Sequence, residues 1–255
     1  MTRSAPSLPV AAPPRVAAWL AAAPDGPVTV LHRCEDAVQL EVAGRCVGLL
    51  SSRVPGLPQS LRSNRPLVSS TGTENAYLEA GILHWGALAL VTGRLVEVRA
   101  PRLDPARVPC TETSPAGVAD LPRSRPAGLV ASTSRVDADS VSGLVGCGEG
   151  LTPLGDDIVC GWLALHRAAG VATPAVDAAV RRLLPRTTAL SAALLECALA
   201  GEVADPVADH LRALGSPRES ATRQRLTCLG STSGTGLAHG IDLARAGLSR
   251  RRNAA

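Results

Sequence analysis

The hydrophobic pattern of this chain changes period near its middle, and the change limits the folds open to it. Residues 37–42 alternate apolar and polar side chains, and a turn at Gly44-Arg45 leads into a second apolar run at 46–50. That alternation is typical of paired β-strands. After residue 136 the apolar residues recur at helical spacing, and Thr173-Pro174 has the composition of a helix start. We therefore predict an α+β protein, with a β-rich N-terminal half (a small barrel or sandwich) followed by an α-helical C-terminal half.

Proline-rich stretches set the predicted boundaries within this plan. The first residues are rich in Pro, Ser and Ala, a composition that favours disorder. In the β-rich half, Thr92-Gly93 is predicted to turn the chain between the last two strands. The expected organisation is a disordered segment with a short helix (1–26), a β-rich domain (27–105), a connector (106–135), a helical domain with a glycine-rich loop (136–248) and a basic tail (249–255).

The composition excludes several classes of protein. All 26 basic residues are arginine, which excludes Walker-type phosphate loops and Schiff-base chemistry because both need a lysine amine. The chain has no Phe and one Tyr, so it lacks the aromatic platforms of single-strand nucleic-acid binders, and no nucleic-acid partner is predicted. The seven cysteines show no Cys-x-x-Cys spacing. No run of about 18 apolar residues occurs, so no membrane span is expected and a cytoplasmic location is predicted.

The most organised segment of the chain is Gly-Cys-Gly-Glu-Gly-Leu-Thr-Pro-Leu-Gly-Asp-Asp at residues 146–157. Its glycines leave backbone N–H groups uncovered, and a helix start adds further N–H donors, so the segment favours an anion. Two adjacent carboxylates would instead repel a bare anion. The mixture indicates a site that holds an anion through a metal or moves protons beside it. The candidate anion-binding residues here are Gly146, Gly148, Gly150, Thr152 and Gly155.

Asp156 and Asp157 are the candidate catalytic residues, and the same two are the candidate ligands of a metal such as Mg²⁺. The alternative is that they only cap the helix and pair with its dipole. Cys147 lies in the same loop, where a helix N-terminus would lower the pKa of a nucleophilic thiol.

Two later segments carry further candidates. Arg186 offers a planar fork to a phosphate or carboxylate, and Thr187 and Ser191 are spaced to share one face of a helix. Ser233 and Gly234 belong to a Ser/Thr/Gly-rich stretch just before the last predicted helix, and this repeats the pattern of an anion-binding helix start. The alternatives are outward-facing helix hydroxyls in the first segment and a capped flexible connector in the second.

These segments, in this order, resemble the family that includes the AllH subunit of the oxamate carbamoyltransferase of the anaerobic allantoin pathway. Its hallmark resembles Gly-x-Gly-x-Gly-Leu-Thr-Pro-x-Gly-Asp-Asp, which this chain matches from Gly146 to Asp157. The Thr/Ser segment at 187–191 and the loop at 230–234 are similar to later features of the family. The resemblance implies a match over about residues 27–247, in which only the first motif is specific.

The resemblance implies a transferase subunit that converts oxamate and carbamoyl phosphate to oxalurate and phosphate in purine and allantoin nitrogen catabolism, together with partner subunits. The alternatives are a non-catalytic subunit that binds a small anion or serves as a scaffold, and a Mg-nucleotide-dependent kinase. The sequence does not identify a cofactor, although Mg²⁺ suits the two carboxylates.

Overall fold

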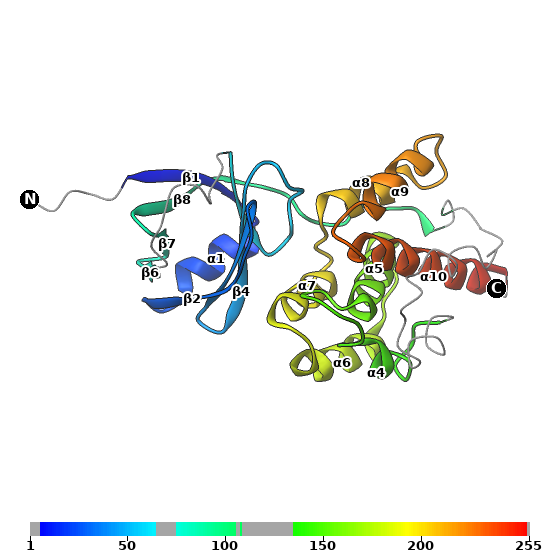
Figure 1. Cartoon of the computed structure of the whole chain (residues 1–255). Helices are drawn as coiled ribbons and strands as arrows, with labels where there is room; N and C mark the ends of the chain where they lie inside the picture. The colour runs from blue at the N-terminus through cyan, green and yellow to red at the C-terminus, as the bar shows by residue number, and fades with distance from the viewer. Residues whose placement is uncertain (1–5, 65–74, 106–107, 109–134, 254–255) are drawn as a thin grey trace, which may run out of the picture. The chain divides into compact units, whose positions relative to one another are not determined.

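The computed structural model describes residues 6–64, 75–105, 108 and 135–253. The chain divides into two compact units, Met1–Val98 and Arg99–Ala255, each of which has its own colour range in Figure 1. The connector predicted at 106–135 lies, except for residues 108 and 135, outside the described residues.

The first unit is a closed barrel of short strands, with strand order β1-β5-β4-β3-β2-β6-β7-β8 among the described residues. This resolves the predicted choice between barrel and sandwich. The strands are β1 (Ser7–Ala12), β2 (Gly26–Arg33), β3 (Ala37–Val42), β4 (Arg45–Leu50), β5 (Ser60–Ser63), β6 (Ala76–Glu79), β7 (Ile82–Trp85) and β8 (Leu88–Leu95).

Local sequence explains two of the hairpins in the barrel. Ala43 and Gly44 join β3 to β4 with φ of 44° and 78°, and Ala80 and Gly81 join β6 to β7 in the same way, with φ of 49° and 77°. Two-residue turns with positive φ match the twist of antiparallel strands, and glycine at the second position removes most of the strain.

The barrel interior is filled almost entirely by aliphatic side chains, as a chain without Phe requires. Leu40, Leu49 and Leu83 are completely buried there, and Trp85 is the largest side chain among them. The helix α1 (Pro14–Ala22) buries Val16 and Leu20 in the same cluster. One face of α1 and the inward-facing side chains of the strands therefore build a single apolar core.

Two predictions about the first unit are wrong. Ser7–Ala12, expected to be disordered, forms β1, which pairs with β5 and β8. Thr92-Gly93 does not turn the chain, because β8 continues to Leu95 and Gly93 is the extra residue where the register with β1 shifts. Both errors have one cause, since β1 finds its partners far away in sequence, where local composition gives no signal.

The second unit is helical. Its elements are α4 (Val141–Leu144), α5 (Leu154–Ala168), α6 (Pro174–Leu183), the 3₁₀ turn η2 (Leu184–Arg186), α7 (Ala189–Leu199), α8 (Asp205–Ala213), α9 (Glu219–Thr227) and α10 (Ser233–Asn253). Residues 249–253, predicted as a basic tail, continue α10 as helix. The fold class is thus α+β in the predicted order.

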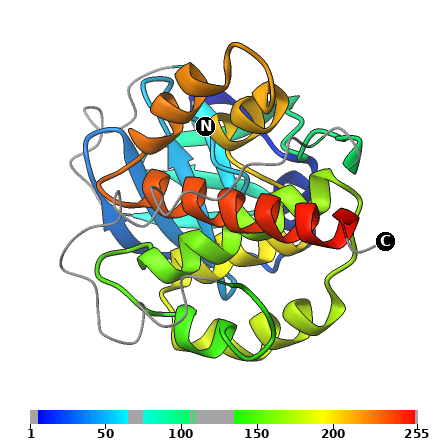
Figure 2. The ribbon, with the colours of Figure 1, turned by 90° about the vertical axis from the view of Figure 1, so that its right-hand side faces the viewer.

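Helix α5 is the centre of this unit, and α10 runs along it (Figures 1 and 2). Glycines let the two backbones touch: a Cβ on Gly161 would lie 2.0 Å from the Leu237 carbonyl oxygen, and one on Gly240 would lie 2.0 Å from that of Ile158. The close crossing brings the first turn of α10 against the first turn of α5, where the two aspartates lie.

Candidate functional site

The glycine-rich loop connects α4 to α5, and its glycines are required by the fold. Gly146, Gly148 and Gly150 have φ of 78°, 129° and 85°, values that other residues rarely adopt. A Cβ on Gly146 would lie 2.5 Å from the Arg186 carbonyl oxygen, and one on Gly155 would lie 2.0 Å from that of Leu144. Close approach of backbones therefore explains at least these two glycines without a ligand.

Some of the backbone N–H groups predicted to bind an anion already donate hydrogen bonds within the chain. The Gly146 N–H donates to Asp156, the Cys147 N–H to the Leu144 carbonyl, and the Gly155 N–H to the Cys147 carbonyl. An anion at this loop would therefore depend on the N–H groups of residues 148–152, of which Gly150 has open space around its Cα.

Asp156 is completely buried and ties three parts of the unit together. Its Oδ1 accepts a 2.8 Å hydrogen bond from the Gly146 N–H, and its Oδ2 accepts from the hydroxyls of Thr187 (2.5 Å) and Ser191 (2.6 Å). Burial raises the pKa of this carboxyl, and the three hydrogen bonds oppose that shift. The carboxyl holds the glycine loop against the start of α7.

Thr187 and Ser191 donate to the same Asp156 oxygen, but they do not share one face of a helix as predicted. Thr187 precedes the helix, because α7 begins at Ala189 and its N-cap is Thr188, whose hydroxyl accepts a 3.1 Å hydrogen bond from the Ser191 N–H. Thr188 also donates to the Leu151 carbonyl at 2.5 Å, which ties the glycine loop to the same cap. Sequence reasoning missed Thr188, although a Thr before an apolar helix is an N-cap signal.

Asp157 has a different environment, although it is the next residue. Its side chain is buried, and its Oδ2 has no hydrogen-bond partner within the described part of the chain. Burial raises the pKa of Asp157 well above the usual range; a hydrogen bond with Ser233 opposes this, and the neighbouring Asp156 charge adds to it. A buried carboxyl with an unsatisfied oxygen is costly for the fold, which is a reason to look for a functional role.

The glycine loop and the Ser/Thr/Gly-rich segment at 230–234 meet at Asp157. The hydroxyls of Thr152, in the glycine loop, and Ser233, at the start of α10, are 2.7 Å apart, and Ser233 also bonds to Asp157. Gly236 allows the first turn of α10 to pack closely against Asp157, since a Cβ at Gly236 would lie 2.8 Å from the Asp157 Cβ. Gly234 has a packing role too, because its Cβ would lie 1.9 Å from the Leu226 carbonyl oxygen.

Arg186 is exposed at the edge of this arrangement. Its Nη1 donates a 3.2 Å hydrogen bond to the Ser142 carbonyl, and the next residue, Thr187, contacts Asp156. Cys147 does not have the environment of an activated thiol. Burial and the nearby Asp156 charge raise its pKa, so the neutral thiol is favoured.

A magnesium site built from both aspartates has limited support in this geometry. Both oxygens of Asp156 accept hydrogen bonds from protein donors, which leaves Asp157 as the carboxylate with a vacant oxygen. The described residues contain no group of three or more His, Cys, Asp or Glu side chains placed to hold a metal ion. Metal binding therefore stays a prediction.

Fold and site together define an α+β protein whose helical unit holds a buried aspartate beside a glycine-rich loop. The family model for the oxamate carbamoyltransferase subunit AllH matches residues 144–245, all within this unit. The match confirms the resemblance predicted from the glycine–aspartate motif.

Comparisons with curated proteins and with solved structures found no match. Among the helices described, none is both long enough and apolar enough to cross a membrane.

Proposed function

We propose that this chain is a subunit of a carbamoyltransferase that works on a small anionic acceptor, with oxamate as the acceptor named by the family description. The family match over residues 144–245 carries the proposal, because that segment contains the glycine loop, both aspartates and Ser233. The family description names a subunit, so we propose that partner subunits complete the enzyme and that it serves purine and allantoin nitrogen catabolism.

The reaction needs a group that accepts a proton. Attack of the oxamate nitrogen on the carbonyl carbon of carbamoyl phosphate forms a C–N bond, breaks the bond from that carbon to the phosphate oxygen, and releases a proton from nitrogen. We assign this proton to the Asp157 carboxylate. Its unsatisfied Oδ2 and raised pKa support the assignment, because a more basic carboxylate is a better proton acceptor near neutral pH.

Ser233 and Thr152 extend this carboxylate into a short polar chain. The Ser233 hydroxyl lies between Asp157 and the Thr152 hydroxyl, which is 2.7 Å away. We propose that the two hydroxyls fix the orientation of the carboxylate and help to bind the acceptor. This role gives a purpose to the contact between two segments 81 residues apart in the sequence.

For the phosphate group of carbamoyl phosphate we propose the N–H groups of residues 148–152, with Arg186 as the charged partner. Uncovered N–H groups before a helix and a guanidinium fork both suit a phosphate. Asp156 is proposed as a positioning residue rather than a catalytic one, because its oxygens hold the loop in place through Gly146, Thr187 and Ser191.

The experiment is a steady-state assay of phosphate and oxalurate formation by the complex of this chain with its partner subunits. Asp157→Asn is expected to lower kcat by about 10²–10⁴-fold, with little change in the KM for carbamoyl phosphate. The matched control is Asp209→Asn in α8, where the carboxyl is 57% exposed and far in sequence from the loop. It should behave like the wild type.

Three other outcomes would contradict the proposal. If Asp157→Asn leaves turnover unchanged while removal of the chain abolishes it, the chain is a scaffold subunit. If the wild-type complex binds carbamoyl phosphate in a calorimeter but never turns it over, the chain is an anion-binding subunit. If turnover requires ATP and Mg²⁺ and yields a phosphorylated acceptor, the chain belongs to a nucleotide-dependent kinase.

A further inference from the structure

The Asp157 carboxylate lies below the surface of the helical unit. The residue is 4% exposed, and its Oδ2 is buried without a hydrogen-bond partner in the described part of the chain. The first turn of α10 packs against it at Gly236. A proton acceptor must lie within hydrogen-bond distance of the proton that it takes, or be joined to it by one group such as a water molecule. A proton from the oxamate nitrogen therefore needs an intermediate group to reach Asp157.

Ser233 has the position of such a group. Its side chain is half-buried, its hydroxyl bonds to Asp157, and its Oγ lies 2.7 Å from the Oγ1 of Thr152. An ionised carboxylate only accepts hydrogen bonds, so Ser233 donates its one proton to Asp157, and the Thr152 hydroxyl donates to Ser233. Because a hydroxyl oxygen can accept two hydrogen bonds, one acceptor position on the Ser233 Oγ is left for a substrate N–H group.

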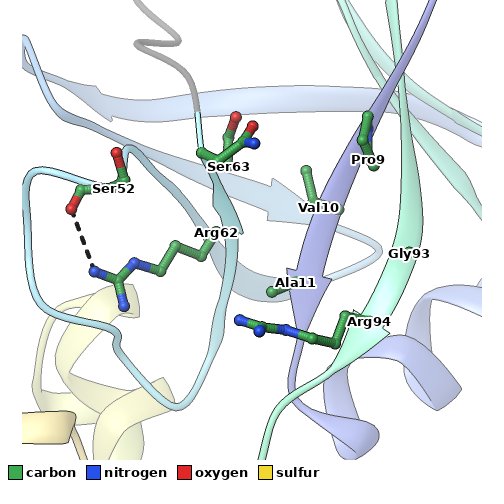
Figure 3. A pocket seen from close by; sticks show the side chains of 9 residues that line it. Pro9, Val10, Ala11, Ser52, Arg62, Ser63, Gly93 and Arg94 are labelled. Atoms are coloured by element: carbon green, nitrogen blue, oxygen red, sulfur yellow. Dashed lines mark hydrogen bonds between the residues drawn. The ribbon is translucent and has the colours of Figure 1, made fainter.

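The cavity of about 470 Å³ on the barrel unit has a different character (Figure 3). There the Arg62 guanidinium donates a 3.3 Å hydrogen bond to the Ser52 carbonyl and is turned away from Ala11. Arg94 lies on the other side of β1, so the two arginines do not converge on one ligand. The hydroxyls beside Asp157, in contrast, have a defined order of donors and acceptors that ends at a carboxylate.

We propose that Ser233 is a catalytic residue, which takes the proton of the oxamate nitrogen as it gives its own proton to Asp157. The step rests on the carbamoyl transfer proposed above. The nitrogen forms a bond to the carbonyl carbon, its proton passes to the Ser233 Oγ, and the Ser233 hydroxyl proton passes to the Asp157 carboxylate. The bond from carbon to the phosphate oxygen breaks, and its electron pair leaves with phosphate. Return of the proton through Ser233 to the phosphate restores the carboxylate.

Thr152 is a positioning residue in this scheme. Its hydroxyl donates to the Ser233 Oγ and so fixes which side of that oxygen faces the oxamate nitrogen. Its own proton does not move during the reaction. Because Thr152 belongs to the glycine loop, the same contact sets the distance between the proposed phosphate-binding N–H groups and the proton relay.

The test is the rate of oxalurate formation by the complex of this chain with its partner subunits. Ser233→Ala is expected to lower kcat by about 10²–10⁴-fold, with the KM for carbamoyl phosphate close to the wild-type value. The matched control is Ser249→Ala on the same helix, where the hydroxyl bonds to the Arg245 carbonyl, and it should turn over like the wild type.

Thr152 supplies a second pair of variants. Thr152→Val keeps the shape of the side chain but removes the hydroxyl, so kcat should fall at least about fivefold, as expected for the loss of one hydrogen bond. Thr152→Ser restores the hydroxyl and should recover most of the rate. Equal losses in both variants would show that the methyl group matters, not the hydrogen bond to Ser233.

Deuterium distinguishes a proton relay from a purely structural role of Ser233. Single-turnover rate constants, which report the chemical step, are measured in mixtures of H₂O and D₂O. In the wild type the rate constant should fall along a curve as the deuterium fraction rises, because two protons move together. Thr152→Val should keep this curvature, since the Thr152 proton stays in place. A straight line or no isotope effect in the wild type would overturn the relay.

The outcomes separate this proposal from the transferase function. If Asp157→Asn is inactive while a folded Ser233→Ala complex keeps kcat within about twofold of the wild type, the relay is wrong and the transferase proposal stands. If the wild-type complex forms no oxalurate, both are wrong. Urea unfolding shows whether Ser233→Ala is folded, and if it is not, the two Thr152 variants and the wild-type isotope effect decide.

Discussion

Replacement of Asp157 by Asn tests whether a buried carboxyl of raised pKa is present in the folded protein. Because the pKa is raised by folding, the unfolded chain releases its proton at lower pH than the folded one. Below the unfolded pKa the Asp157 carboxyl therefore costs the folded state no stability, and this cost in free energy of unfolding grows as the pH rises toward the folded pKa. Above the folded pKa the cost is constant.

The same linkage sets how steeply the free energy of unfolding changes with pH. Over the interval between the two pKa values, the wild-type free energy of unfolding should fall by about 1.4 kcal/mol per pH unit relative to the Asn variant. The Asn amide adds its own cost, since a buried N–H group without a partner costs about 1–3 kcal/mol. That cost does not depend on pH, so the slope of the difference is the decisive quantity.

The assay is urea unfolding of wild type and Asp157→Asn from about pH 4 to about pH 8, where carboxyl linkage dominates. Asp209→Asn, which removes a largely exposed carboxyl, supplies the baseline. We expect Asp157→Asn to gain stability relative to wild type as the pH rises. A difference that is flat across this range would refute the idea that Asp157 is a buried carboxyl held at high pKa.

Three more predictions concern stability and share the same unfolding assay. Asp156→Ala should lose about 3–5 kcal/mol, because it leaves one fully buried donor (the Ser191 hydroxyl) and two partly buried donors without their acceptor, and a loss below about 1 kcal/mol would contradict the role assigned to it. Gly240→Ala should cost about 1–3 kcal/mol or more of stability, since the new Cβ would lie 2.0 Å from the Ile158 carbonyl oxygen of α5. The control is Gly247→Ala on the same helix, where a Cβ would have nothing within 4 Å, so this variant should be neutral or stabilising. Equal effects of the two substitutions would refute the close crossing of α5 and α10. Burial, and then the Arg223 charge, lower the pKa of His210 from its ordinary 6.5, so the free energy of unfolding should fall as the pH drops below 6.5. His210→Gln should remove this part of the pH dependence. If the variant loses stability with falling pH as steeply as the wild type, the prediction is wrong.

Local patterns in the sequence predicted the fold class because they record local physics. The alternation at 37–42 and the turn before β4 specify a hairpin without help from the rest of the chain. Strand β1 has no such signal, because its stability comes from β5 and β8, more than 50 residues further along. Composition rich in Pro and Ala therefore indicated disorder where long-range pairing makes a strand.

The candidate site shows the same division. The motif identified the loop and both aspartates, but it did not distinguish their roles. Asp156 and Asp157 differ because α5 turns one toward the start of α7 and the other toward α10, and only the tertiary packing decides which carboxyl is satisfied. The raised pKa of Cys147 has the same origin, because burial of the thiol, and then the charge of Asp156 beside it, outweigh the favourable effect expected of a helix N-terminus.

The most direct test of the central claim is the rate of oxalurate formation from carbamoyl phosphate and oxamate by the reconstituted complex, measured with wild type, Asp157→Asn and Asp209→Asn. We predict that wild type and Asp209→Asn turn over equally, and that Asp157→Asn loses at least about two orders of magnitude in kcat while it remains folded and assembled. Full activity in a folded, assembled Asp157→Asn complex would contradict the account.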